Sequence, residues 1–272
     1  MSDTLSYCKP SSVQDAALSF ERTDEARYLS GGMTLLPTMR MRLVAPDQLI
    51  DLSDCGLSDI VVGEGEMTIG AMATHHKVAT SSVVQDLLPA LSDLAGGIGD
   101  RQVRARGTIG GSVANNDPAA CYPAAVLALN ATIITNQRRI LAEDYFVDLF
   151  ETALSDSEII TGISFPIASK AGYVKAPNPA SRYALVGVFV AQTNAGIRVA
   201  VTGAGEAGVF SWQEAQTALE TNFSSSAVAG IKADTDGLMA DIHASADFRA
   251  HMMTTMLQKA VTKANAPHIK EA

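Results

Sequence analysis

The sequence has few cysteines and no long apolar run. Its three cysteines, Cys8, Cys55 and Cys121, lie far apart in a chain of 272 residues. They match neither a disulfide framework nor the grouped thiolates of an iron–sulfur or zinc site, so we expect no metal site in this chain. No apolar run approaches the roughly 18 residues that a membrane-spanning helix needs, so we expect no membrane span.

Positive charge is also scarce. The chain has 20 lysines and arginines against 29 aspartates and glutamates, which gives a net charge of −9. Nucleic-acid binding relies on a basic surface, so we expect no nucleic-acid partner. An anionic small molecule stays possible if backbone N–H groups bind it. The first residues, MSDTLSYCKPSS, contain no basic segment followed by an apolar one, and we expect a cytoplasmic protein.

Helix and strand patterns alternate along the chain, which predicts an α+β fold. Ser12–Phe20 and Val83–Leu94 have the apolar spacing of helices, and a strand at Arg27–Ser30 leads through Gly31-Gly32 into a helix that Thr34 opens. Further helices are expected at 122–129, 211–220 and 246–263, and further strands at 48–52, 60–62, 67–71, 132–135, 158–165, 183–192 and 197–202.

The length of the chain favours two unequal domains. The composition shifts to Ser, Gly, Ala, Lys and Pro over Ser164–Pro179, which we interpret as the junction between them. The expected division is a first domain at 1–168, with subdomains at about 1–55 and 56–168, and a second domain at 169–272.

Two glycine pairs are the strongest local signal. Ser30–Thr34 reads SGGMT, and Thr108–Ser112 reads TIGGS. Glycine lets the backbone approach a ligand closely, and the first N–H groups of a helix favour a phosphate. Two such loops hold both phosphates of a dinucleotide without a lysine, although neither matches the Rossmann or Walker pattern. The alternative is that each pair is only a tight turn.

Longer stretches around both loops resemble the FAD-binding medium subunit of molybdenum hydroxylases, the xanthine dehydrogenase family, and most of all its carbon monoxide dehydrogenase branch. The resemblance rests on LSGGMTLLPTMRMRLVAPDQLIDL, GDRQVRARGTIGGSVANNDPAACYPAAVLAL and GYVKAPNPASRYALVGVFVA, which begin at Leu29, Gly99 and Gly172. They follow in the right order and extend over nearly the whole chain. The resemblance implies a two-part FAD-binding domain of the molybdenum-hydroxylase/vanillyl-alcohol-oxidase-like type, followed by a small α+β domain with helices packed on a sheet.

The same resemblance assigns contacts with a noncovalent FAD. Both glycine loops would wrap its pyrophosphate through backbone N–H groups, Asn115 and Asp117 would follow the ribityl chain, and Lys175 would reach toward the flavin. Ile160 matches a position that packs near the cofactor in relatives, and Tyr173 lies two residues before Lys175. The predicted cofactor-binding residues are Ser30, Gly31, Gly32, Met33, Thr34, Thr108, Ile109, Gly110, Gly111, Ser112, Asn115, Asp117, Ile160, Tyr173 and Lys175.

Several of these residues have plain structural alternatives. Asp117 also suits an Asx turn before Pro118. Lys175 also suits a solvated position in a linker, and Ile160 also suits the ordinary core of a strand. Met33 stands where relatives commonly have a histidine or another polar residue.

Residues outside the predicted set have alternatives of their own. Cys121 stands where relatives often have aspartate, and we expect it to be a small buried core residue. His75-His76 lack the i, i+4 spacing of a metal pair and suit surface or helix-start positions. Three arginines, Arg101, Arg104 and Arg106, either neutralise pyrophosphate, face a partner subunit or form a solvated surface.

The resemblance implies an oxidoreductase subunit with no catalytic acid, base or nucleophile of its own. FAD in this chain would take electrons from the 2Fe–2S clusters of a small partner subunit, fed by a large molybdopterin-binding subunit, and pass them to quinone, cytochrome or NAD. The molybdopterin and 2Fe–2S groups would lie only on those partners, in a dimer of heterotrimers. The alternatives are a stand-alone NAD(P)H-dependent flavin reductase and a flavin-free assembly or scaffold relative. Substrate choice would belong to the large subunit.

Overall fold

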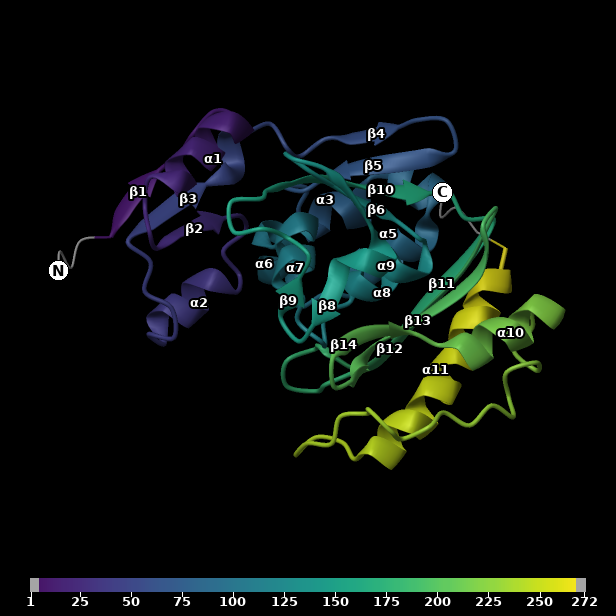
Figure 1. The fold of residues 1–272 in the computed structure, drawn as a ribbon. Helices are drawn as coiled ribbons and strands as arrows, with labels where there is room; N and C mark the ends of the chain where they lie inside the picture. Colours follow the sequence, from purple (N-terminus) through teal and green to yellow (C-terminus); the bar gives the residue numbers. More distant parts are fainter. Residues whose placement is uncertain (1–4, 268–272) are drawn as a thin grey trace.

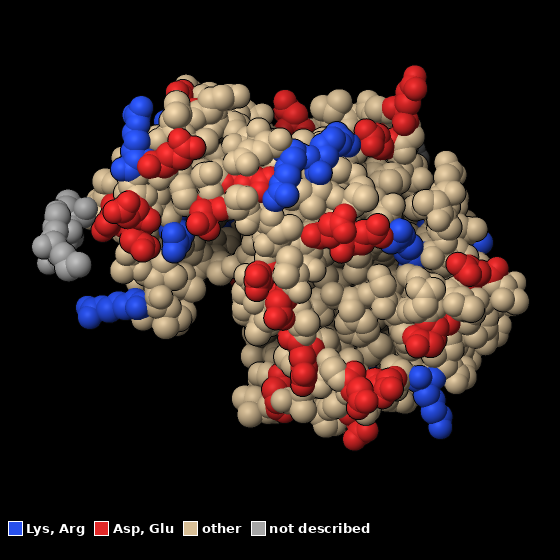
Figure 2. Space-filling model, viewed as in Figure 1, with Lys and Arg blue, Asp and Glu red and all other residues tan. Residues whose placement is uncertain are grey.

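A computed structural model describes residues 5–267, and their helices and strands form three parts (Figure 1). A small N-terminal lobe precedes a central part, and a C-terminal sheet with two helices follows. Among residues 5–267, no helix combines the length and the apolar character that a membrane crossing requires. Aspartate and glutamate side chains are spread over the face seen in Figure 2, with fewer lysines and arginines between them.

The N-terminal lobe is a parallel sheet in the order β1-β3-β2, with one helix packed on it. Ser12 caps this helix by accepting a hydrogen bond from the backbone N–H of Asp15. A small core of Ala16, Ala26 and Ile50 joins helix and sheet. The elements are β1 (Ser6–Cys8), α1 (Val13–Glu21), β2 (Ala26–Leu29), α2 (Leu35–Arg40), β3 (Gln48–Asp51) and a 3₁₀ turn at Leu52–Asp54.

The central part is a five-stranded antiparallel sheet in the order β4-β5-β10-β6-β7, packed against short helices. Its strands are β4 (Ile60–Val62), β5 (Glu66–Gly70), β6 (Thr132–Thr135), β7 (Arg139–Leu141) and β10 (Ile160–Pro166), with a separate hairpin of β8 (Phe146–Asp148) and β9 (Glu151–Thr152). Its helices are α3 (His75–Thr80), α4 (Ser82–Leu87), α5 (Pro89–Gly96), α6 (Arg101–Arg106), α7 (Ile109–Asn115), α8 (Tyr122–Ala128) and α9 (Ala142–Tyr145).

One predicted helix of this part is wrong in its extent. The sequence favoured a single helix over Val83–Leu94, but α4 ends at Leu87 and α5 begins at Pro89. Proline has no N–H group to continue a helix and suits the first helical position, so it starts a new helix in a new direction.

The C-terminal part is an antiparallel sheet in the order β11-β12-β13-β14, with α11 packed on β11 and β12. Val186, Val188 and Val190 face α11, whereas Phe189 and Ala191 belong to the core of the central part. The elements are β11 (Lys170–Pro177), β12 (Ala184–Thr193), β13 (Gly196–Gly205), β14 (Gly208–Ser211), α10 (Gln213–Thr221) and α11 (Ala246–Asn265). The polar stretch Ser164–Pro179 is therefore mostly strand, and only residues 167–169 separate the two sheets.

Candidate functional site

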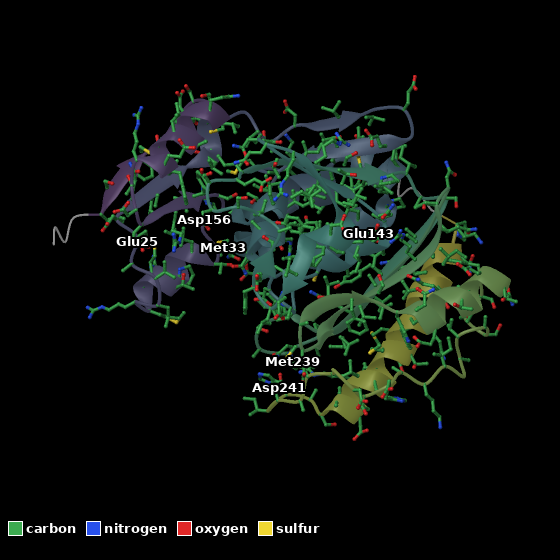
Figure 3. All side chains as sticks on the ribbon, in the orientation of Figure 1. Glu25, Met33, Glu143, Asp156, Met239 and Asp241 are labelled. Atoms are coloured by element: carbon green, nitrogen blue, oxygen red, sulfur yellow. The ribbon has the colours of Figure 1, made fainter. Side chains whose placement is uncertain are left out.

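A cavity of about 1040 Å³ lies where the three parts of the molecule meet. Its lining includes the first glycine loop from the N-terminal lobe, α7 from the central part and residues around the β11–β12 loop. In Figure 3, Met33 of the first loop and Asp156 of the segment before β10 both lie between the N-terminal lobe and the central part. A second cavity, of about 680 Å³, lies around the β13–β14 turn and contains none of the predicted site residues.

The two glycine stretches, 78 residues apart in sequence, lie against each other at this cavity. The hydroxyl oxygens of Ser30 and Thr108 are 2.6 Å apart and share a hydrogen bond. A Cβ atom on Gly31 would overlap the carbonyl oxygen of Arg106 and lie 2.8 Å from Cα of Gly107. Only glycine therefore allows this close approach of the first loop to the segment that leads into α7.

The first loop presents backbone donors that have no partner. The N–H groups of Gly31, Gly32, Met33 and Thr34 donate to no atom of residues 5–267. They directly precede the first turn of α2, and all four residues line the cavity. Clustered free N–H groups next to a helix start form a binding site for an anion.

The second glycine pair does not offer the free N–H groups that we predicted. Gly110 and Gly111 lie inside the first turn of α7, and Thr108 caps that helix through its side chain. The N–H groups of Ile109, Gly110, Gly111 and Ser112 donate to Ala73 O, Ala71 O, Thr108 Oγ1 and Thr108 O, at 2.9 to 3.1 Å. These backbone donors are therefore occupied, and the α7 residues with polar side chains that line the cavity are Ser112 and Asn115.

Most of the predicted residues line this one cavity, and two do not. Ile109 is buried in the core, and Tyr173 is buried with its hydroxyl beside Cys121, outside the cavity lining. The predicted residues that line the cavity are Ser30, Gly31, Gly32, Met33, Thr34, Thr108, Gly110, Gly111, Ser112, Asn115, Asp117, Ile160 and Lys175. Ile160 also belongs to the buried core, which was its alternative.

Asp117 forms the Asx turn that the sequence offered as an alternative, and it also lies at the cavity. Its Oδ1 accepts a hydrogen bond of 2.8 Å from the N–H of Ala119, which closes an Asx turn. The residue also lines the cavity, and burial raises the pKa of its carboxyl group. One carboxylate can thus shape the turn and present its other oxygen to a ligand.

Lys175 is a fixed cation in the wall of the cavity, and it is not a solvated linker residue. Its Nζ donates to Gly97 O at 2.9 Å, to Arg182 O at 2.8 Å and to Cys121 Sγ at 3.4 Å. All three ammonium protons are therefore used. Cys121 is buried, as expected, and it also lines the cavity.

The histidine and arginine groups take positions that the sequence described only in part. His75 begins α3, one of the two expected positions, but its side chain is buried against Tyr122. Burial and the nearby positive charge of Arg104 lower its pKa to about 4, so the ring is neutral near pH 7. Arg104 donates to the carbonyls of Ile98 and Gly99, while Arg101 and Arg106 are exposed.

Several lining residues were not singled out from the sequence. Tyr28 stacks on Phe20 with ring centroids 4.8 Å apart, and Tyr183 enters from the β11–β12 loop. Phe150 lies at the tip of the β8–β9 hairpin with a φ of 56°. No local pattern marks them, because only the folded chain brings these segments to the cavity.

Comparisons with known proteins identify the family of the chain. Residues 3–168 match the family model described as FAD binding domain in molybdopterin dehydrogenase. The chain is 32% identical over 281 residues to the carbon monoxide dehydrogenase medium chain of Afipia carboxidovorans, with 97% of each covered. It is 31% identical over 277 residues to the nicotine 6-hydroxylase medium subunit of Paenarthrobacter nicotinovorans, with 96% of this chain and 98% of the relative covered.

The fold also resembles that of a solved structure. This chain is similar to a chain of carbon monoxide dehydrogenase from Hydrogenophaga pseudoflava that lacks the Mo-pyranopterin moiety of its cofactor. The TM-score is 0.85, and the identity is 29% over 96% of each chain. The predicted α+β fold with a FAD-binding domain is therefore confirmed. This chain belongs to the FAD-binding medium subunits of the molybdenum hydroxylases, a family of oxidoreductase subunits.

Proposed function

We propose that this chain holds FAD in the cavity of about 1040 Å³, receives electrons from the 2Fe–2S clusters of a small partner subunit and passes them to an external quinone, cytochrome or NAD. The observation that carries the proposal is the run of unpaired N–H groups from Gly31 to Thr34, four residues that all line this cavity. FAD supplies the carrier that takes up electrons and releases them as a pair. The chain itself supplies binding, orientation and a fixed charge.

The donor set of the cavity fits a diphosphate. The free N–H groups of the first loop bind phosphate oxygens without a lysine, which is consistent with the net charge of −9. On the α7 side, the Ser112 hydroxyl and the Asn115 amide supply side-chain donors in place of the occupied backbone groups. The free oxygen of Asp117 accepts hydrogen bonds from sugar or ribityl hydroxyls.

The cavity wall around Lys175 suits a ring that becomes negatively charged on reduction. Lys175 holds its positive charge in the cavity wall, fixed by three acceptors. A fixed cation stabilises an anion without reorganisation.

We further propose partners and a location. The relatives include proteins named as a medium chain, a medium subunit and the alpha subunit of a dehydrogenase complex. By analogy, this chain would join a large molybdopterin-binding subunit and a small 2Fe–2S subunit in a dimer of heterotrimers, in the cytoplasm. The boundary between the two domains would lie between residues 168 and 169, where the chain passes from the central sheet to β11.

The purified complex that contains this chain tests the function. We expect it to carry about one noncovalent FAD per copy of this chain, released on denaturation and bleached when the substrate-oxidising subunit turns over. Absorbance spectra recorded before and after denaturation measure the FAD content. Spectra recorded before and after anaerobic turnover measure the bleaching. A colourless chain would support the scaffold alternative. Nicotinamide-dependent activity of the chain alone would support the flavin reductase.

Replacing Lys175 with methionine tests the proposed role of its charge. We expect the two-electron reduction potential of the bound FAD to fall by roughly 30 mV or more, equivalent to about 1.4 kcal/mol. Loss of the cation destabilises the reduced, anionic ring. Spectroelectrochemical titration measures the potential. The matched control is Lys170→Met on the same strand, because Lys170 pairs with Asn265 and Phe223 away from the cavity. An unchanged potential in Lys175→Met would contradict the role.

A further inference from the structure

Helix α2 has an outer side that nothing in residues 5–267 covers. The helix has only six residues, Leu35–Arg40, and none of them is buried. Figure 1 shows α2 projecting from the N-terminal lobe, beyond its sheet. Helices shorter than about 12 residues are marginal on their own and depend on packing against something else. The inner side of α2 faces the cavity, because Leu35 and Thr38 line it, but no residue between 5 and 267 covers the outer side.

The residues of this outer side have the composition of a protein–protein interface. We call it the α2 surface and define it by Leu36, Arg40, Met41, Arg42 and Leu43. Met41 and Leu43 are 62% and 70% exposed, and Leu36 is 37% exposed. Methionine and arginine are enriched in interfaces, and a group of exposed apolar side chains marks an interaction site.

The two arginines of the α2 surface have no acidic partner. In the described part of the chain, neither Arg40 nor Arg42 lies within 4.0 Å of a carboxylate oxygen. Figure 2 shows a face on which acidic side chains predominate, whereas a basic side chain stands out where Figure 1 places α2. An acidic partner is thus repelled by much of this protein and attracted to the α2 surface.

Arg42 occupies a backbone conformation that favours glycine. It follows the end of α2 with a φ of 58°, and its N–H donates to Met39 O at 2.9 Å. The N–H of Leu43 donates to Thr38 O at 3.0 Å, which completes the Schellman motif. A side chain costs free energy in this left-handed position, where glycine is the usual residue. The chain nevertheless has an exposed arginine there, and no ion pair within residues 5–267 offsets this cost.

We propose that the α2 surface docks the electron-delivering partner subunit, through a contact area on that partner that is apolar at its centre and acidic at its rim. The apolar side chains supply the buried centre of the contact, and Arg40 and Arg42 pair with the acidic rim. Because the inner side of α2 lines the cavity, a subunit on its outer side is placed next to the bound cofactor. The identity of the partner rests on the proposed function, whereas the location of the docking surface does not.

Substitutions at the α2 surface test this docking in the complex purified from its source through a tag on this chain. Arg42→Gly removes the side chain and relieves the backbone, so a loss of partner is not a loss of fold. We expect the iron content per tagged chain, which reports the 2Fe–2S partner, to fall about threefold or more in Arg42→Gly. In Met41→Glu/Leu43→Glu it is expected to fall at least tenfold. The matched controls are Arg22→Ala, an exposed arginine that directly follows α1, and Val61→Glu, an exposed apolar residue on β4.

The outcomes separate docking from cofactor binding. We expect every variant to keep the FAD content of the wild type and a melting temperature of the isolated chain no lower than that of the wild type, with an unchanged iron content in both controls. Full iron content in Met41→Glu/Leu43→Glu would overturn the proposal. So would a wild-type chain that dimerises alone through this surface and becomes monomeric in the double variant. A wild-type complex that contains iron but no FAD would count against the proposed function, and the iron readout would still test the docking.

Discussion

Gly31→Ala is expected to weaken FAD binding by about 10- to 100-fold, because the methyl group has no space. Its Cβ would overlap the carbonyl oxygen of Arg106 and lie 2.8 Å from Cα of Gly107. Both neighbours are backbone atoms at the end of α6, so only separation of the two glycine stretches relieves the overlap. That separation moves the free N–H groups of the first loop away from Ser112 and Asn115.

Titration of the FAD-free chain with FAD, followed by flavin fluorescence, measures this effect. The control is Gly230→Ala, because a Cβ at Gly230 meets no atom within 4 Å. Melting temperatures without FAD show how much of the effect is on the fold. Wild-type affinity in Gly31→Ala would mean that the contact between the two glycine stretches is not needed to hold the cofactor.

Glu158 is expected to give the protein about 3 kcal/mol of pH-dependent stability. Burial acts to raise the pKa of its carboxyl group, but hydrogen bonds from Arg138, Ser155 and Thr135 outweigh it and lower the pKa to about 2. Arg138 donates to both carboxylate oxygens at 3.0 Å, and Thr135 Oγ1 donates at 2.7 Å. The folded pKa lies below the usual value of 4.5, so this contribution is present above pH 4.5 and is lost as the pH falls toward 2.

Urea unfolding of the wild type and of Glu158→Gln at several pH values between 7 and 3 measures the contribution. We expect the difference in free energy of unfolding to be largest at pH 7 and to shrink below pH 4.5. His75 is unchanged between the two proteins, so its own loss of stability between pH 6.5 and 4 cancels in the difference. The control is Glu143→Gln, which breaks an exposed ion pair of 3.6 Å with Arg198 and is expected to cost little. A difference that does not change with pH would contradict the assignment.

Local signals were enough for most elements of the fold. The apolar spacing of Ser12–Phe20 predicted α1, and the strands predicted at 60–62 and 132–135 have the bounds of β4 and β6. The sequence did not indicate strand β11, which lies in the polar stretch Ser164–Pro179, because the packing of this strand depends on a helix far away in sequence. A Cβ on Gly172 would overlap the carbonyl oxygen of Ala260 in α11, so glycine here serves helix–sheet packing and not a linker.

The site was predictable as a set of segments and not as a set of contacts. Both glycine pairs reach one cavity, as the resemblance implied, but which N–H groups are free depends on the carbonyls of Ala71 and Ala73, far away in sequence. The same limit applies to Lys175, whose acceptors come from three separate segments. Sequence spacing identifies a donor, whereas tertiary structure decides whether that donor is already used.

The small size of the N-terminal lobe predicts that this lobe is the first part of the molecule to separate from the rest. The buried core of this lobe has few residues, and one of them, Ile159, comes from the segment before β10 and also lines the cavity. A lobe with so little buried apolar area separates from its neighbours at a lower cost than the rest of the chain. A molecule bound in the cavity touches both the N-terminal lobe and the central part, and it therefore stabilises the closed state by mass action. We therefore expect the empty protein to be cut by proteases at this lobe first, and the loaded protein to resist them.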